Sequence, residues 1–563
     1  MAQLVPVLCK PVIPGDRFKV SLAYQMQLGA MLNPVYDGVE VNFEAFFSPN
    51  RIIDPKWRDF WTGYNEFDQM TPVDVAPLTL RVMNAEGNPI DFENLQRDDN
   101  PLLGNSSLLD FIGYQFAFTY DNGYPVLPNV NSNSRQQLFS LNAFPIMHYH
   151  RIYDDWYRNE RTQKASLYDW YNGTQPRNID VLLGSLNQVD GDHLVDVEHY
   201  STSSGKLENS GLLAFHYRNY AKDRFTTALP EPVIGGDVRI PVGEDGFGYI
   251  GGVAGQSLLN NAQGVNVTSR DGVSAVVVDR TASNPSGVSL NALALGTIQQ
   301  LKLALKEYQY RMKDTYNGNR YVESIQSHFG VRVPDSTLQR SLYLGSARDY
   351  VNFGEVYQTS SGDGQGENGA LGDYAGRGSA QGQHFMFDET FYEPGYIFVI
   401  MSISIKARYF QGVQRHLSRF ERDDYFSPEY QNIGDDFLRN DEIFNDTLDS
   451  GGQPTVPDSV DLNTGVFGYN SRWYDLKSYH DELHGDFKQF NFNSQTGSLD
   501  YGPMATWTFT RAFESTPVIS SEFSRVPIIN RPFVDTDQRN DNFFVDMVFN
   551  IDALRPILAV ESF

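Results

Sequence analysis

Three stretches of the chain alternate apolar and polar residues with a period of two, which is typical of β-strands with one buried face. They are residues 38–47, 397–409 and 542–552. The apolar face of the second and clearest stretch comprises Ile397, Val399, Met401, Ile403, Ile405 and Ala407. The opposite face carries Ser402, Ser404, Lys406 and Arg408. This alternation predicts antiparallel sheets in which one face is wetter than the other.

Two other stretches have helical periodicity. Residues 145–163 begin with Pro145, which suits a first helical position, and nothing after it breaks a helix for more than four turns. Large apolar side chains share one face, namely Ile146, Tyr149, Ile152, Tyr153, Trp156 and Tyr157. The other face holds the charged residues Arg151, Asp154, Asp155, Arg158 and Arg161, which predicts exposed ion pairs four residues apart. The second helix is expected at 298–316, with a stripe of Leu301, Leu305, Tyr308, Met312 and Tyr316.

No regular alternation of strands and helices links these segments, which argues against a doubly wound sheet or a (β/α)₈ barrel. Strands far apart in the sequence must therefore pair. The pattern predicts a mainly β chain, an antiparallel β-sandwich of the jelly-roll kind with long helical and loop insertions. Residues 1–232 and 295–563 would form this domain, and the Gly-, Ser-, Asn- and Val-rich residues 233–294 would be an inserted surface module. Residues 359–384 are expected to form a flexible, glycine-rich loop.

The aromatic helix also contains His148 and His150, which raises the question of a metal or catalytic site. On a helix, two residues at this spacing point to nearly opposite sides, so they cannot share one metal ion. We therefore interpret the segment as packing, in which Tyr149, Tyr153, Trp156 and Tyr157 seek a large partner surface.

Composition narrows the class of protein. The 563 residues include 44 Lys and Arg against 70 Asp and Glu, so the net charge is 44 − 70 = −26, and such a chain should not bind nucleic acid unaided. Cys9 is the single cysteine, which excludes an intrachain disulfide framework and fits folding in a reducing cytoplasm.

The N-terminus has prolines where the apolar core of a signal peptide should run, and no segment has eighteen uninterrupted apolar residues, so no membrane insertion is expected. Aromatic residues make up 13% of the chain, a load typical of extensive β-structure or large buried interfaces.

The sequence contains no complete motif for catalysis, for cofactor binding or for metal binding. Gly364, Gly366 and Gly369 have the spacing of a dinucleotide fingerprint but lack the preceding strand and the following helix. The acidic run 190–199 lacks the glycine and the final acidic residue of a calcium loop. We find no GxSxG, HExxH or P-loop motif. We therefore predict no enzyme activity and assign no catalytic, cofactor-binding or metal residue, although a carboxylate pair formed by distant residues stays open.

One segment has the residue composition of a surface that binds single-stranded nucleic acid. Residues 410–430 place Arg415, Arg419 and Arg422 among aromatic rings, the combination that binds single strands through phosphates and stacked bases. These arginines are candidates to face DNA. The alternative, subunit contacts between these arginines and acidic neighbours, is the better supported of the two.

Eight ordered segments give the chain a resemblance to a known family. It resembles the major capsid proteins of Microviridae, small tailless phages with circular single-stranded DNA, and especially their gokushovirus-like branch. The segments are residues 12–20, 32–51, 144–160, 218–232, 320–345, 410–436, 466–487 and 543–557.

The resemblance implies an eight-stranded antiparallel jelly roll, one chain per asymmetric unit of a T=1 icosahedral shell of sixty copies, around single-stranded DNA. The chain would be a component of the virion, assembled in the cytoplasm of a bacterial host. The aromatic helix would be one of the additions that hold the jelly roll to neighbouring subunits. Because the chain is so acidic, a small basic DNA-packaging protein is the implied partner.

The resemblance also implies a role for the inserted module. In the gokushovirus-like branch a variable insertion at this place forms protrusions at the threefold axes, and here it would contact a host surface receptor such as a glycan. Its candidate residues are Gly235, Phe247, Tyr249, Val276 and Val278. Two rival classes stay open on the residues alone, a β-sandwich carbohydrate-active hydrolase and a phage adhesin that only binds.

Overall fold

The computed structural model divides the chain into two compact units. One comprises Met1–Pro232 and Pro334–Phe563, and the other comprises Val233–Val333. The structure describes residues 2–65, 72–83, 107–114, 119–121, 124–126, 140–167, 170–171, 177–182, 206–207, 210–232, 265–268, 275–278, 298–317, 321–331, 339–354, 376–430, 434–445, 463, 465–488, 490–493, 498–502, 504–527, 529–535 and 542–557.

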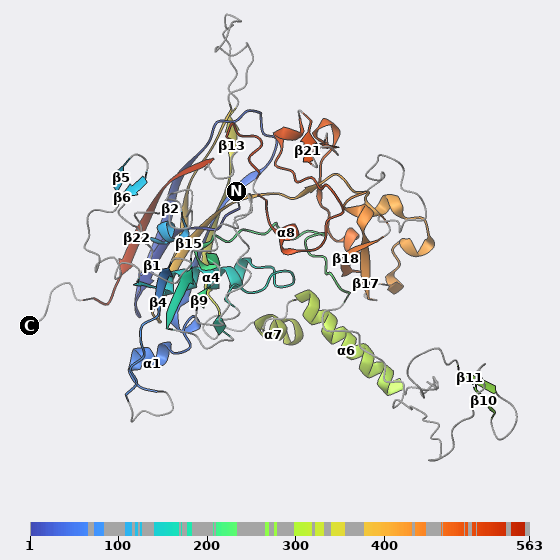
Figure 1. The fold of residues 1–563 in the computed structure, drawn as a ribbon, viewed down its shortest axis with the longest axis horizontal. Helices are drawn as coiled ribbons and strands as arrows, with labels where there is room; N and C mark the ends of the chain where they lie inside the picture. Colours follow the sequence, from blue (N-terminus) through green and yellow to red (C-terminus); the bar gives the residue numbers. More distant parts are fainter. Residues whose placement is uncertain are drawn as a thin grey trace, which may run out of the picture. The chain divides into compact units, whose positions relative to one another are not determined.

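Two four-stranded antiparallel sheets form the body of the first unit (Figure 1). The first sheet has the order β1 (Val5–Val12), β15 (Gly395–Ile405), β3 (Val39–Pro49) and β12 (Leu342–Tyr350). The second has the order β13 (Asn352–Gly354), β14 (Arg377–Thr390), β2 (Arg17–Leu28) and β22 (Phe543–Leu554). Strands far apart in the sequence pair in both sheets, as predicted.

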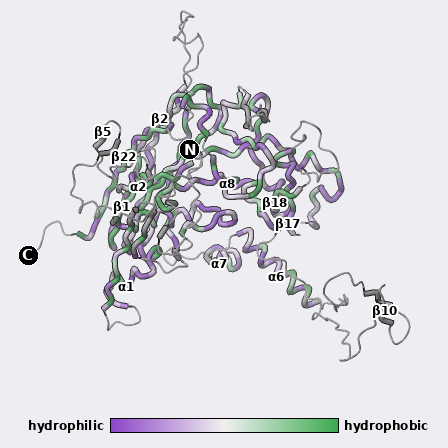
Figure 2. The backbone as a smooth tube through the Cα atoms, viewed as in Figure 1, coloured by the Kyte–Doolittle hydropathy of each residue, from purple (hydrophilic) through white to green (hydrophobic). Residues whose placement is uncertain are grey.

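A hydrophobic core joins the two sheets. It includes the predicted apolar faces of β3 and β15, among them Val41, Phe43, Val399 and Ile403. The predicted apolar residues of β22, from Phe543 to Ile551, pack against the same core. All three predicted strands are confirmed, and Figure 2 shows hydrophobic and hydrophilic residues alternating along the strands.

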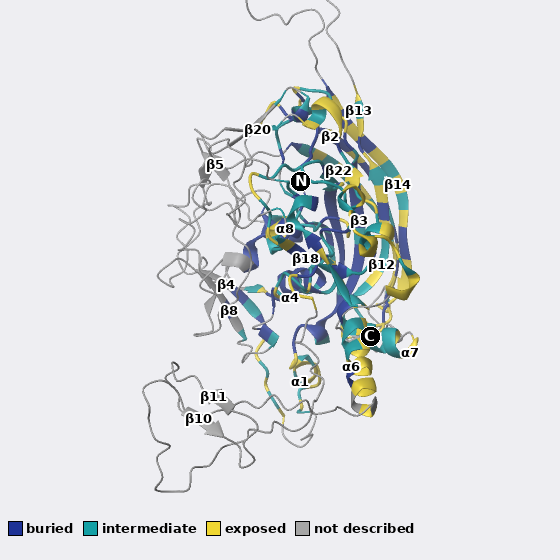
Figure 3. Cartoon of the chain, turned by 90° about the vertical axis from the view of Figure 1, so that its right-hand side faces the viewer, coloured by how far each residue is buried: buried dark blue, intermediate teal, exposed yellow. Residues whose placement is uncertain are grey.

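The second faces of these strands differ from the prediction. On β22 this face is exposed, as expected. On β3 and β15 it is largely covered, because Phe46, Phe398 and Ile400 belong to a second core that also contains the aromatic helix. This face is wetter than the first in that Glu40, Glu44 and Ser404 are half-buried, but the two central strands are packed on both sides. Figure 3 shows the contrast between these dark blue strands and β14, where buried and exposed residues alternate.

Polar side chains form one of the contacts between the two sheets. Asp349 on β12 accepts a hydrogen bond from the Tyr24 hydroxyl on β2 at 2.7 Å and lies 2.6 Å from His384 Nε2 on β14. A Cβ at Gly382 would lie 2.4 Å from the Asp349 carboxylate, so a side chain there would displace this contact. The contact links strands of the two different sheets.

The predicted aromatic helix is real but shorter. It consists of α4 (Phe144–Ile152), which continues into a π-helical turn, η3 (Tyr153–Tyr157), and the chain then becomes extended at Arg158. Arg151 and Asp155 form the predicted ion pair at 3.0 Å. The prediction that the charged face of this helix is exposed was wrong. Asp154 is buried, where it accepts hydrogen bonds from the backbone N–H groups of Ser166 and Leu167.

The remaining elements are short in most cases. The first unit also contains α1 (Trp57–Thr62), α2 (Leu108–Ile112), α8 (Ser521–Ser524), β4 (Thr79–Met83), β5 (Thr119–Asp121), β6 (Tyr124–Val126), β7 (Ser140–Asn142), β8 (Asn178–Leu182), β9 (Lys206–Leu207), β16 (Arg408–Tyr409), β17 (Asp435–Arg439), β18 (Val466–Ser471), β19 (Asp481–Glu482), β20 (Phe490–Asn493) and β21 (Ser498–Tyr501). Strands β4, β7, β8 and β9 form a further small sheet.

The second unit contains the two-stranded antiparallel pair β10 (Val265–Thr268) and β11 (Ala275–Val278) and the helices α6 (Ile298–Asn317) and α7 (Tyr321–Phe329). The predicted helix at 298–316 is therefore present as α6. This unit ends at Val333, beyond the predicted end of the inserted module at residue 294, because it includes both helices. No helix in the described part of the chain is both long enough and apolar enough to cross a bilayer.

The predicted glycine-rich loop is only partly described. Residues 376–384 are not a loop, because β14 begins at Arg377 and Ala380 is buried in the sandwich core. Small residues here allow close packing, since a Cβ at Gly378 would lie 2.9 Å from Leu28. Gly364, Gly366 and Gly369 lie outside the described residues.

Candidate functional site

The predicted DNA-facing arginines lie in a distinct part of the first unit, which we call the arginine lobe and define as residues 408–445 and 465–488. Its framework consists of β17 paired antiparallel with β18 and β16 paired parallel with β19. A separate small core supports it, made of Phe225, Ala228, Tyr409, Leu438, Ile443, Phe467 and Phe523. The arginines therefore sit on their own packed substructure.

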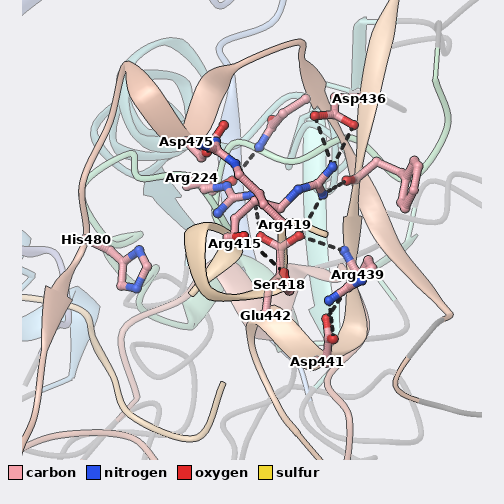
Figure 4. A network of polar contacts seen from close by, with 12 residues as sticks. Arg224, Arg415, Ser418, Arg419, Asp436, Arg439, Asp441, Glu442, Asp475 and His480 are labelled. Atoms are coloured by element: carbon pink, nitrogen blue, oxygen red, sulfur yellow. Dashed lines mark hydrogen bonds and ion pairs between the residues drawn. The ribbon is translucent and has the colours of Figure 1, made fainter. Parts of the chain in front are cut away.

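Glu442 is the centre of the lobe's polar network (Figure 4). Its side chain is 1% exposed and pairs with two arginines. One is Arg224, itself 7% exposed, whose Nη2 contacts Oε2. The other is Arg415, whose Nη1 donates to Oε1 at 2.9 Å. Two guanidinium groups thus enclose one buried carboxylate.

The backbone holds Glu442 in this position. A short 3₁₀ turn, η10 (Asn440–Glu442), places it directly after β17. The neighbouring chain segment approaches closely, because Val413 N–H donates to Asp441 O at 2.8 Å and Asn445 N–H donates to Gln411 O at 2.9 Å. Between these two bonds, a Cβ at Gly412 would lie 1.9 Å from the carbonyl oxygen of Glu442. Only glycine allows this approach.

The other arginines of the lobe are paired as well. Arg415 also contacts Asp436, with its Nη2 at 3.2 Å from Oδ1. Arg419 pairs with Asp475, and Arg439 pairs with Asp441 at 2.5 Å. Of these pairs, Arg419–Asp475 joins the two segments of the lobe, so this ion pair helps to hold its two halves together.

The positive and negative formal charges of the network are balanced. Burial alone would lower the pKa of Arg415, but Glu442 and Asp436 raise it above its ordinary value, so this arginine stays charged. Burial raises the pKa of the Asp436 carboxyl, and Arg415 opposes the rise. The two cations Arg224 and Arg415 face the two carboxyl groups Glu442 and Asp436, so their formal charges sum to 2 − 2 = 0 when both acids are ionised. The network offers no uncompensated positive charge to a phosphate.

The structure therefore argues against two of the three DNA-facing candidates. Arg415 and Arg419 are occupied by acidic side chains of their own chain, and only Arg422 presents an exposed side chain for which the described residues give no ion pair. Sequence reasoning missed Arg224, Asp436, Glu442 and Asp475. No local signal could have found them as partners, because they are distant in sequence from the arginines they meet.

The surface of the lobe is rich in exposed apolar side chains. Phe420 is 84% exposed and Tyr479 is 85% exposed. The other large exposed ones are Leu417, Tyr425, Phe426, Tyr430, Phe437, Val466 and Leu476. The two segments that carry them touch, since Phe426 packs edge-on against Trp473 at 5.5 Å and Arg472 lies 5.1 Å over the ring of Tyr430. An apolar surface of this kind is typical of a protein contact.

The two helical histidines contact different partners, as their positions on the helix predict. His148 lies 2.6 Å from the Ser48 hydroxyl and 2.9 Å from Asn50 Oδ1. His150 lies 2.7 Å from His216 Nε2 and 2.9 Å from the carbonyl oxygen of Leu212. In the described part of the chain, no group of three or more histidine, cysteine or acidic side chains is placed to hold a metal ion.

The aromatic residues predicted to pack between subunits pack mostly inside their own chain. Tyr149 is buried and donates to Leu4 O at 2.8 Å, while the buried Tyr153 stacks on the ring of His216 at 3.6 Å. The Tyr157 hydroxyl donates to Glu44. The expectation of an intersubunit surface is corrected for these three, because the second core of the unit covers them. Trp156 is only 37% exposed, because Phe46 and Tyr343 pack against its ring, and its role between subunits stays a prediction.

Of the predicted protrusion residues, Gly235, Phe247 and Tyr249 lie outside the described residues. Val276 and Val278 belong to β11, where they pair with Val267 and Val265 of β10.

Comparison with known proteins places the whole chain among capsid proteins. A sequence model of the family described as "Capsid protein (F protein)" matches residues 1–85 and 127–562. The chain is 27% identical to capsid protein VP1 of Chlamydia phage 1, over 99% of this chain and 92% of that protein. It is 25% identical to capsid protein VP1 of Bdellovibrio phage phiMH2K and 24% identical to capsid protein VP1 of Spiroplasma virus 4, each over 99% of this chain and 91% of the relative.

Proposed function

The chain belongs to the family of phage capsid (F) proteins, and we propose that it is the major capsid protein of a T=1 icosahedral shell of sixty copies that encloses a circular single-stranded DNA genome. The observation that carries this proposal is the similarity to three viral capsid proteins along 99% of the chain. A capsid protein is a component of the virion and acts by assembly, so we propose no catalytic activity for it.

The fold supports the proposal. Two four-stranded antiparallel sheets enclose one core, and very long connections separate strands that are neighbours in a sheet, such as β3 and β15. A viral jelly roll has this general architecture, and it tolerates long insertions. We infer that the two sheets are the capsid jelly roll and that the arginine lobe is one of its additions.

The charge of the chain bears on how the genome is enclosed. With a net charge of −26 and its buried lobe arginines already paired, the chain has little to attract DNA phosphates. We propose that a small basic protein accompanies the DNA into the shell. Binding of purified chain to single-stranded DNA at physiological salt, without any other protein, would contradict this.

The test of the proposed function is assembly. We expect the expressed chain, or particles carrying it, to form closed shells of icosahedral symmetry with one chain per asymmetric unit, visible by electron cryomicroscopy. The rival functions make a different prediction, because a hydrolase or an adhesin would stay as small soluble oligomers. Turnover of a polysaccharide that disappears when one carboxylate is replaced would overturn the proposal.

We propose further that residues 233–294 form a projection around each threefold axis that contacts a host surface receptor such as a glycan. The segment begins at the boundary of a separate compact unit, which starts at Val233. Replacing it with a short glycine linker should leave shell assembly intact, because the free energy of loop closure changes by only about 0.6 kcal/mol for each doubling of length. The same particles should lose adsorption to host cells.

The two readouts separate the two parts of this prediction. Loss of assembly would mean that the segment belongs to the shell. Normal adsorption by the trimmed particles would remove the attachment role.

A further inference from the structure

We propose that the exposed surface of the arginine lobe is a self-complementary contact, through which two copies of this chain meet across a twofold axis. The inference rests on the proposed function as a capsid protein and names the surface and the partner. The apolar component of the contact would be centred on Phe420 and Tyr479.

The first step is that the described residues of the chain leave this surface uncovered. Phe420 and Tyr479 are among the most exposed large apolar side chains in the described part of the protein, at 84% and 85%. They come from different segments of the lobe, and the Arg419–Asp475 ion pair links these two segments, with Arg419 directly preceding Phe420. Isolated exposed aromatic residues are ordinary, whereas several on one rigid substructure indicate a binding surface.

The second step is that nucleic acid is a poor occupant. The arginines that would hold phosphates, Arg415 and Arg419, are held by carboxylates of the same chain. The exposed charges beside Phe420 are Glu421, Arg422 and Asp423, which carry one positive and two negative charges. A strand of DNA would meet net repulsion here.

The third step is that the charges of Glu421, Arg422 and Asp423 can pair with those of a second copy of this surface. In a contact across a twofold axis, each residue faces the same patch of the other copy, so a patch must be complementary to itself. Alternating signs meet this requirement, because Arg422 of one copy can lie against Asp423 of the other while the aromatic rings pack together. Aromatic rings at the centre with polar, charged residues around the rim are also the usual anatomy of a protein interface.

The backbone of the patch is fixed before any contact forms. The Asp424 carboxylate accepts hydrogen bonds from the N–H groups of Phe420, at 3.0 Å, and Glu421, at 2.9 Å. These bonds lower the pKa of Asp424, so the carboxylate stays ionised. Little conformational entropy is then lost on association, which favours a contact made by so few residues.

Crosslinking tests the geometry. The chain has one native cysteine, Cys9, and burial raises the pKa of its thiol to about 12, so it is a poor nucleophile. Particles of Phe420→Cys treated with a short bis-maleimide should give covalent dimers on a denaturing gel. Tyr392→Cys is the matched control, because Tyr392 is 82% exposed but lies outside the lobe, between β14 and β15, and it should stay monomeric.

Charge exchange tests the complementarity. Arg422→Glu places like charges opposite each other, and we expect the yield of particles to fall at least tenfold. Adding Asp423→Arg to that variant restores opposite charges across the axis and should restore the yield. Hydrogen exchange of the unassembled variants checks that the lobe is still folded.

The outcomes separate this inference from the proposed function. Assembled Phe420→Cys particles without crosslinked dimers, or full particle yield from Arg422→Glu, would overturn the twofold contact while leaving the capsid function in place. Normal shells of Arg422→Glu that lack DNA would instead assign Arg422 to the genome and also overturn it. Failure of the unmodified chain to form shells would count against the proposed function itself.

Discussion

Replacing Glu442 with glutamine is expected to destabilise the arginine lobe by about 3–5 kcal/mol, the usual cost of removing one partner from a buried ion pair. The amide keeps the shape of the side chain but not its charge. Arg224 then loses its carboxylate partner in a site where it is 7% exposed, and Arg415 keeps only Asp436. The cost comes from two cations left in a poorly solvated site rather than from the loss of one hydrogen bond.

Hydrogen exchange measured by mass spectrometry is the suitable readout, because it follows the lobe separately from the sandwich. Peptides from residues 408–445 should exchange faster in Glu442→Gln, while peptides from β3 and β15 should not change. The matched control is Asp388→Asn, which removes the carboxylate from the exposed pair with Arg17 and should leave exchange unchanged. Wild-type protection of the lobe in Glu442→Gln would show that the network is not needed for its folding.

The elements that could be predicted from the sequence are those whose local pattern agrees with their final surroundings. Strand β22 alternates cleanly because one of its faces stays in water. The apolar faces of β3 and β15 were predicted for the same reason. Their second faces were not, because Asn42 and Ser402 look like surface residues although both are buried. Asn42 donates to Ser404 and accepts from Arg348, so its burial depends on partners supplied by other strands.

The candidate site shows the same limit more strongly. The arginine-rich, aromatic-rich composition of residues 410–430 was visible in the sequence, but its meaning depended on where the acids lie. Glu442 lies 27 positions from Arg415, and Asp475 lies 56 positions from Arg419. The same arginines would suit DNA if those carboxylates lay elsewhere. Composition therefore identified an important segment, and only the fold shows that its charges are already paired.

The buried histidines should make the folded chain sensitive to acid. His150 has a complete set of hydrogen bonds as a neutral ring, because Nε2 must donate to Leu212 O and Nδ1 must then accept from His216 Nε2–H. A second proton on His150 would place two N–H groups against each other. Burial lowers the pKa of His150 to about 4, and it lowers the pKa of His216 well below its ordinary value. His148 lies between the Ser48 hydroxyl and Asn50 Oδ1, and burial lowers its pKa to about 3.

The direction of the pH dependence follows from these shifts. Above about pH 6.5 each ring is neutral in both the folded and the unfolded chain, so none of them affects stability. As the pH falls below that value, the unfolded chain takes up protons that the folded chain refuses. The free energy of unfolding then drops by up to about 1.4 kcal/mol per pH unit for each histidine, until the folded pKa is reached. For His150 this window runs from about pH 6.5 to about 4.

Urea unfolding of the unassembled chain, followed by tryptophan fluorescence at a series of pH values, measures this effect. His150→Gln keeps a donor for Leu212 O but cannot be protonated, so it should be less stable at pH 7.5 and yet lose stability more slowly as the pH falls. The slope of the free energy of unfolding against pH should be shallower than that of the wild type by up to about 1.4 kcal/mol per pH unit between pH 6 and 5.

Acidic side chains contribute equally to both proteins, so the difference between the two slopes reports the contribution of His150 alone. His416→Gln alters an exposed histidine and should leave the slope unchanged. Equal slopes for the wild type and His150→Gln would mean that His150 carries its extra proton in the folded chain, and that the His150–His216 contact rearranges in acid to accommodate it.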